Sequence, residues 1–204
     1  LWNGEAVELT PTGFYIDPES IHTVALPPIR RGENTLEITL RFGDITQIES
    51  YYLLGDFGVR VSGSSAVITE RASELTAGDI SSQSLPFYGG NVTYHYTLNG
   101  GGHRAIELSR YVGAAVTVDV DGVRAGHLTF PPYLLDLGDL SDGEHRIDVT
   151  VFGTRMNTLG DIHNVDELEP CGPFVWRTSG NRFAYEYMLL PMGLLTTPRI
   201  LEIL

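Results

Sequence analysis

The sequence predicts an antiparallel all-β sandwich with little helix. Its 204 residues include 23 Gly and 11 Pro, which suit many tight turns, and 42% of the residues are hydrophobic, enough for a packed core. Apolar residues recur at every second position in several runs, which is the period of a strand with one buried face. The length suits one large β domain, or one and a half small ones.

The stretch from 116 to 163 has the clearest strand and turn pattern. Its order is a strand at 116–120, an Asp-Gly turn at 121–122, a short strand at 135–137, a Ser-Asp-Gly turn at 141–143, a strand at 147–151 and a polar loop at 155–163. The Asp-Gly pair favours a turn because both residues tolerate positive φ. We therefore expect a sandwich with a functional loop at one end.

Alternation also predicts strands outside this stretch. Asn99-Gly100-Gly101-Gly102 predicts a hairpin turn between two of them. Residues 69–80 could form a short helix or a loop. The further predicted strands are 36–42, 51–61 with a bulge or tight bend, 92–96, 105–108, 183–189 and 200–204.

Part of the central pattern occurs twice. The apolar and Gly-Glu positions of 29–40 match those of 140–151 at a constant offset of 111 residues, and Val24 and Leu26 fall on Leu135 and Leu137. Two copies of one sandwich half explain this match, and convergent strand patterning is the alternative. We expect three parts: residues 1–62 as a partial sandwich half that is separate or adds strands, 63–84 as a linker, and 85–204 as the main domain.

Composition excludes several classes of function. The net charge of −13 argues against nucleic-acid binding, and no apolar run reaches the roughly 18 residues of a membrane span. All 13 basic residues are Arg, so Schiff-base and P-loop lysine chemistry are excluded. The single Cys171 rules out an internal disulfide. Because the chain begins at Leu1, we expect a piece of a longer protein, and the sequence leaves its compartment and oligomeric state open.

The strand and turn order of 116–151 resembles the sugar-binding domain of family 2 glycoside hydrolases. Three further blocks, 87–90 (FYGG), 154–160 (TRMNTLG) and 172–177 (GPFVWR), resemble C-terminal regions of large bacterial glycoside hydrolases, including α-L-rhamnosidase-like proteins. The resemblance implies a galactose-binding-like jelly roll over 85–204. It also implies a non-catalytic accessory domain that braces a catalytic barrel outside this chain and in some cases binds carbohydrate.

Sugar recognition needs an aromatic face with polar groups around it. We hypothesise that Trp176 stacks on a sugar ring while Arg155, Asn157 and His163 bind its hydroxyls. The alternative is that Trp176 fills one end of the sandwich and Asn157 caps a turn through the backbone. The complete set of candidate sugar-binding residues is Trp176, Arg177, Arg155, Asn157, His163, Tyr88 and Tyr133.

Two other kinds of site are alternatives to this one. Asp161, Asp166, Glu167 and Glu169 flank His163 and could provide an acid/base pair of a glycoside hydrolase, although a solvated acidic loop is the simpler interpretation. The sequence predicts no cofactor and no metal site. A structural calcium ion at Asp136, Asp139 and Asp142 is possible, but turn formation is favoured because the EF-hand spacing is absent. A protein-interaction module is a further alternative to the scaffold.

Overall fold

The computed structural model describes residues 1–16, 21–46, 50–165 and 178–203. It divides the chain into two compact units, Leu1–Leu53 and Leu54–Leu204. The first unit contains β1 (Pro11–Phe14) and β2 (His22–Val24), which pair antiparallel. The elements of the second unit are β3 (Gly58–Ser62), β4 (Ser65–Thr69), η1 (Ile80–Ser82), β5 (Val92–Asn99), β6 (Gly102–Glu107), β7 (Tyr111–Val112), β8 (Ala115–Val120), β9 (Val123–Leu128), β10 (Leu134–Leu140), β11 (Glu144–Phe152), α1 (Met156–Leu159), β12 (Gly193–Leu194) and β13 (Arg199–Glu202).

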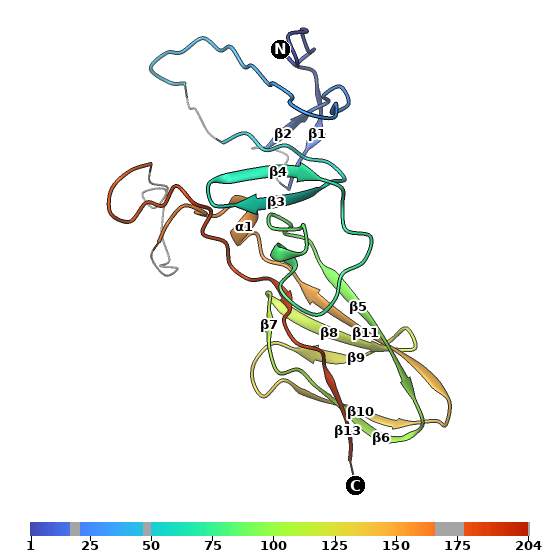
Figure 1. The fold of residues 1–204 in the computed structure, drawn as a ribbon. Helices are drawn as coiled ribbons and strands as arrows, with labels where there is room; N and C mark the ends of the chain where they lie inside the picture. The colour runs from blue at the N-terminus through green and yellow to red at the C-terminus, as the bar shows by residue number, and fades with distance from the viewer. Residues whose placement is uncertain (17–20, 47–49, 166–177, 204) are drawn as a thin grey trace. The chain divides into compact units, whose positions relative to one another are not determined.

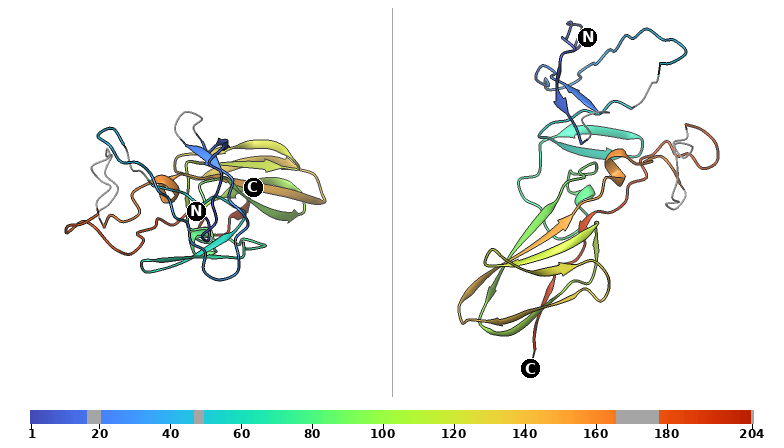
Figure 2. Two further views of the ribbon diagram at one scale, coloured as in Figure 1. Left: turned by 90° about the horizontal axis from the view of Figure 1, so that it is seen from above. Right: turned by 180° about the vertical axis from the view of Figure 1, so that it is seen from behind.

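The second unit is an antiparallel β-sandwich, which confirms the predicted fold class. One sheet has the strand order β5-β11-β8-β9 and the other has the order β10-β6-β13 (Figure 1, and from two further sides in Figure 2). Two short pairs, β3-β4 and β12-β7, complete the strands. The only helical elements in the described residues are the single turns η1 and α1.

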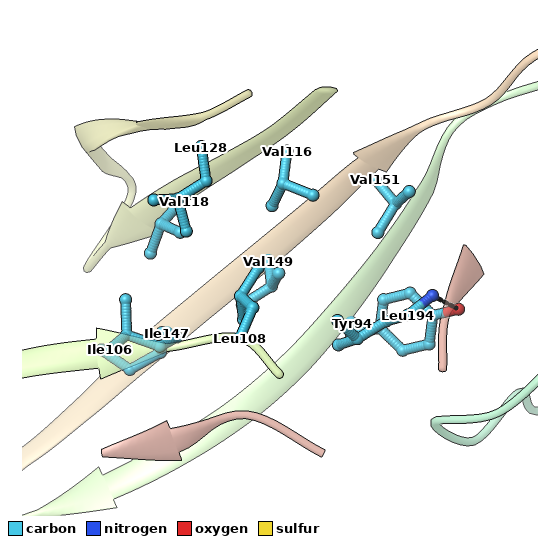
Figure 3. Close-up of a cluster of buried hydrophobic side chains, with 10 residues drawn as sticks. All are labelled: Tyr94, Ile106, Leu108, Val116, Val118, Leu128, Ile147, Val149, Val151 and Leu194. Carbon is cyan, nitrogen blue, oxygen red and sulfur yellow. Dashed lines mark hydrogen bonds between the residues drawn. The ribbon is translucent and has the colours of Figure 1, made fainter. Parts of the chain in front are cut away.

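The core lies between the two sheets, where the alternating residues predicted from the sequence are buried. Val116 and Val118 of β8 and Ile147 and Val149 of β11 are fully buried. They meet Ile106 of β6 from the other sheet, as Figure 3 shows. The cluster also contains Tyr94, Leu108, Leu128, Val151 and Leu194, and the Leu194 amide donates to the Tyr94 hydroxyl at 3.1 Å. Alternation in 116–151 therefore reflects a buried sheet face.

The Asp-Gly turn predicted at 121–122 is confirmed. Asp121 has φ +50° and Gly122 has φ +80°, and they join β8 to its antiparallel partner β9. Two successive positive φ values are the geometry of a type I′ hairpin turn, which matches the twist of the flanking strands. Asp and Gly adopt this geometry at low cost.

The hairpin predicted at Asn99–Gly102 is wrong. A strand does follow as β6, but β6 pairs with β10 and β13, whereas β5 pairs with β11. The chain therefore crosses from one sheet to the other at this turn. Gly100 and Gly102 have φ +101° and +89°, and the Gly100 amide bonds the Gly143 carbonyl at 2.8 Å, which ties this crossing to the start of β11.

The strand predicted over 36–42 is absent. Leu36 forms one antiparallel bridge with Trp2, and the residues that follow are irregular. Ile38 and Leu40 are 44% and 42% exposed, whereas their counterparts in the repeat, Val149 and Val151, are buried. The two matching segments therefore share a sequence pattern but not a structure, because within the described residues 36–42 pairs with another segment only through the Trp2–Leu36 bridge. Of the predicted strand at 51–61, only residues from Gly58 onward form β3.

The strand predicted over 183–189 is also absent, apart from a bridge between Asn164 and Phe183. Its backbone bonds go to two segments: the Ala184 and Met188 amides donate to His163 and Ile162, and the Tyr187 amide donates to Gly63. Alternation here arises because Phe183 and Tyr187 both face His163. By contrast, the closing strand near 200–204 is confirmed as β13.

The predicted division into 1–62, 63–84 and 85–204 stays a prediction. The structure places its unit boundary after Leu53, and β4 and η1 lie within the segment expected to be a linker. The hairpin β3-β4 pairs residues on both sides of position 62. Among the helices of the described residues, none has the length and apolar character that crossing a bilayer requires.

Candidate functional site

The FYGG block and the loop after β11 lie against each other through glycine contacts. A side chain at Gly153 would place its Cβ 2.2 Å from the Gly90 carbonyl oxygen, and one at Gly89 would lie 2.7 Å from Thr158 Oγ1. The Thr158 hydroxyl donates to the Phe87 carbonyl at 2.7 Å. Glycine is therefore required here for close backbone approach. Two of the blocks that carry the family resemblance form one packed contact.

Asn157, a predicted sugar ligand, lies inside α1 and is 3% exposed. Its Nδ2 donates to the Leu190 carbonyl at 2.7 Å, and its Oδ1 accepts the Leu190 amide at 3.0 Å. Both ends of the amide are thus bonded to the backbone of Leu190, which agrees with the alternative that Asn157 bonds the backbone. Arg155 precedes the helix and its side chain is exposed.

His163 lies at the centre of a row of rings. Its ring centroid is 4.9 Å from that of Tyr187 and 5.8 Å from that of Phe183. At the two ends of the row, the ring centroids of Tyr187 and Phe87 are 5.5 Å apart and those of Phe183 and Tyr185 are 5.1 Å apart. Both pairs are edge to face. We call Phe87, Tyr187, His163, Phe183 and Tyr185 the aromatic row. It links three segments distant in sequence.

The imidazole of His163 is held by the backbone. Its Nδ1 lies 3.1 Å from the carbonyl oxygens of both Ala184 and Glu186. Because a carbonyl oxygen only accepts, Nδ1 carries the proton and donates to them. His163 therefore fixes the path of 183–187 from inside the aromatic row.

The remaining sequence candidates lie in different surroundings. Tyr88 is 41% exposed, and its hydroxyl donates to the Asn91 carbonyl at 3.2 Å, near the FYGG contact. Tyr133 packs on Tyr111 with ring centroids 4.9 Å apart, and both rings pack against the sandwich core. Burial raises the pKa of Tyr111. Trp176 and Arg177 lie outside the described residues, as do Asp166, Glu167 and Glu169.

Sequence reasoning missed two features near this site. Tyr185, at one end of the aromatic row, is 75% exposed, but its position in an alternating run suggested a strand residue. An open groove of about 730 Å³ lies along β3, β4 and η1. Its lining residues are Val59, Arg60, Val61, Thr69, Glu70, Ser81, Ser82, Ser84 and Leu189.

Asp136 and Asp139, two of the three residues considered for calcium, form ion pairs, and Asp136 also stabilises a turn. Asp136 Oδ1 lies 2.9 Å from His103 Nε2 and accepts the Gly138 amide at 2.8 Å, and Asp139 Oδ1 lies 3.3 Å from His103 Nδ1. Hydrogen bonding to Asp136 raises the pKa of His103, and the Gly138 amide lowers the pKa of Asp136. Across the described residues, no three His, Cys, Asp or Glu side chains are grouped so as to hold a metal ion.

Comparison with known proteins finds similarity among solved structures. No protein-family model matches the chain, and no match to a curated protein is found. A rhamnosidase from Novosphingobium sp. PP1Y is similar over 71% of this chain and 14% of its own, with 21% identity and a TM-score of 0.44. A GH2 beta-galacturonidase from Eisenbergiella tayi, in structures with galacturonate and with glycerol, is similar over 46% of this chain and 17% of its own, with 19% identity and a TM-score of 0.32. The chain thus spans about a sixth or less of each of these proteins.

Proposed function

We propose that this chain is a non-catalytic accessory domain of a glycoside hydrolase, and that its main role is to hold neighbouring domains of the parent protein in place. The strand and turn order of 116–151 and the blocks at 87–90, 154–160 and 172–177, which resemble family 2 and rhamnosidase-like enzymes, support the class. The antiparallel sandwich agrees with the fold that this resemblance implies.

The scaffold role is supported by the hydrogen bonds that the loop side chains make to the backbone of other segments. Asn157 bonds the backbone of Leu190, Thr158 bonds the backbone of Phe87, and His163 bonds the backbone of 184–186. A sugar site needs polar groups that are free to converge on hydroxyls. These groups instead connect segments of the chain, and we call this connected end of the sandwich the platform.

A catalytic role for the loop around His163 has less support. In that loop, the His163 imidazole donates through Nδ1 to two carbonyls and is packed between rings, which restricts its movement toward a substrate. Incubation of the chain with a panel of chromogenic glycosides should give no turnover. Turnover that disappears in Asp161→Asn or Glu167→Gln would overturn the non-catalytic assignment.

The scaffold role is tested in the parent enzyme. We expect the coding sequence beside this chain to contain a catalytic barrel. Removing residues 54–204 should lower the thermal midpoint of that enzyme, while the kcat of the remaining folded fraction changes little. A parent protein without a catalytic domain, or an unchanged thermal midpoint, would contradict the proposal.

Carbohydrate binding is the second candidate, and the exposed ring of Tyr185 favours it. An aromatic face open to solvent offers the stacking surface that the C–H side of a sugar requires. Calorimetric titration with mono- and oligosaccharides should detect binding that Tyr185→Ala removes and Tyr51→Ala leaves intact, since Tyr51 is also exposed but lies in the first unit. If no sugar gives a heat of binding, the scaffold role is the only one of the two that remains.

A further inference from the structure

Residues 36–42 present a row of apolar side chains to solvent. Leu36, Ile38, Leu40 and Phe42 alternate with polar residues, and their exposed fractions range from 42% to 74%. The repeat counterparts of Leu36, Ile38 and Leu40 on β11, which are Ile147, Val149 and Val151, belong to the sandwich core. An exposed segment with the pattern of a core strand is a template for pairing with another chain.

The backbone of this segment has one occupied edge and one open edge. The Glu37 amide donates to the Leu1 carbonyl at 2.9 Å, and the Asn3 amide donates to the Thr35 carbonyl at 2.8 Å. These two bonds lie on either side of the Trp2–Leu36 bridge. The backbone N–H and C=O groups of the odd-numbered residues therefore point toward residues 1–3. Because successive residues direct their N–H and C=O groups to opposite edges, the even-numbered residues face away.

The segment can pair with a further strand along this open edge. Within the described part of the chain, no backbone hydrogen bond reaches Ile38 or Leu40. No residue of 36–42 has a positive φ, so none of them must reverse its backbone to become extended. The edge therefore offers backbone donors and acceptors beside an apolar face.

We propose that a second copy of this chain covers this edge, by antiparallel pairing of residues 36–42 with the same residues of the other copy, centred on Thr39. In this register Ile38 lies opposite Leu40 of the other copy, and Leu36 lies opposite Phe42. On the reverse face Glu37 lies opposite Arg41, and the twofold symmetry repeats every pair. The segment is thus complementary to itself in both hydrophobicity and charge.

Charge complementarity selects this register over its neighbours. Moving the centre to Ile38 places Glu37 opposite Thr39, and moving it to Leu40 places Glu37 opposite Gly43. With Thr39 at the centre, the odd-numbered positions form the pairs that share no backbone bonds, where side chains approach more closely. Two Glu–Arg pairs and one Thr–Thr pair then stabilise the interface. The inference concerns the first unit alone and is independent of the scaffold role.

Sedimentation of the full chain over a wide concentration range tests the pairing. We expect a concentration-dependent dimer that Ile38→Asp abolishes and that Ile45→Asp, a control at a more exposed apolar site outside the segment, leaves intact. Ile38 is already 44% exposed, so its substitution removes no buried core contact. Glu37→Arg should weaken dimerisation about tenfold, and the double variant Glu37→Arg with Arg41→Glu should restore it.

Cross-linking tests the register separately and does not depend on a variant that removes apolar surface. In a Cys171→Ser background, Thr39→Cys should form a disulfide-linked dimer, because paired residues at a non-hydrogen-bonded position lie within disulfide reach. Thr35→Cys should not, since it faces Gly43 of the other copy. Any of four results would overturn the proposal. These are a monomer at every concentration, a dimer that Ile38→Asp does not change, a charge swap that does not restore dimerisation, and equal cross-linking at both cysteines.

Discussion

His145 Nδ1 lies 2.7 Å from Asp121 Oδ2, and this contact joins the β8–β9 turn to β11. Its other nitrogen, Nε2, lies 2.8 Å from the Ser141 carbonyl oxygen. Both neighbours accept, so the imidazolium form, in which both nitrogens donate, satisfies both contacts. Asp121 also accepts the Arg146 amide at 2.9 Å through Oδ1. The side chain of His145 therefore joins two turns that the sequence predicted separately.

This contact makes stability depend on pH in a defined window. Hydrogen bonding to Asp121 raises the pKa of His145 above 6.5, so its stabilisation is full below that pH and is lost as pH rises through the raised value. Hydrogen bonding to His145 lowers the pKa of Asp121 below 3.8, so that contribution is full above 3.8 and is lost as pH falls through the lowered value. We expect the greatest contribution between these two ordinary values.

Urea unfolding at several pH values measures this dependence. The midpoint should fall as pH is raised from 6 to 8, and His145→Gln should reduce that slope, leaving the part that comes from His103, whose pKa is also raised. The matched control is His127→Gln on β9, where the histidine is exposed, and its slope should follow that of the wild type. An unchanged slope in His145→Gln would show that other groups set the pH dependence.

Strands could be predicted from the sequence where alternation coincides with a buried sheet face. Val116, Val118 and Val149 alternate because β8 and β11 lie at the centre of a sheet with a second sheet on one side. The same alternation at Ile38 and at Tyr185 gave wrong predictions, because the period of a sequence does not show whether a partner strand is present. Nor could Gly100–Gly102 show which sheet receives the next strand.

The candidate site was predictable in part for a similar reason. The sequence predicted a functional loop at 155–163, which stays a prediction; the structure shows that the FYGG block contacts this loop. The role of Asn157 could not be read from its neighbours in sequence, because its partner Leu190 is 33 residues away. The aromatic row likewise joins residues from three separate segments.

The amide of Asn157 should prove structural when it is removed. Asn157→Ala leaves the Leu190 amide and carbonyl without their partner, and such a loss in a mostly buried setting costs about 1–3 kcal/mol of unfolding free energy. Arg155→Ala, two residues earlier and exposed, should change stability by about 0.5 kcal/mol or less. Chemical unfolding of both variants makes the comparison. Equal stability of the two would mean that the Asn157 contact contributes nothing net.

The two copies of the repeat should respond differently to the same truncation. Ile147→Ala opens a cavity in the sandwich core and should cost about 2–5 kcal/mol, measured as faster exchange of the β11 amides. Leu36, its counterpart in the first copy, is 45% exposed, and Leu36→Ala should leave β11 exchange unchanged. Loss of β11 protection in Leu36→Ala would contradict the separation of their structural roles.

The contact between the FYGG block and the loop after β11 should fail if either backbone is pushed away. A Cβ at position 153 would lie 2.2 Å from the Gly90 carbonyl oxygen and 2.9 Å from that of Gly89, and backbone atoms cannot give way as a flexible side chain can. We expect Gly153→Ala to lower the unfolding free energy by about 1–3 kcal/mol and to weaken the Thr158–Phe87 bond beside it. Gly43→Ala is the control, because its nearest atom is Thr46 Oγ1 at 3.9 Å, and it should change stability by about 0.5 kcal/mol or less.

Thermal unfolding compares the Gly153→Ala and Gly43→Ala variants, and amide exchange at 87–91 and 153–160 locates the effect. Exchange that rises in these two segments while the β5–β11–β8 sheet stays protected would show that the platform at this end of the sandwich opens as a unit, and unchanged exchange would show that the contact does not hold it closed.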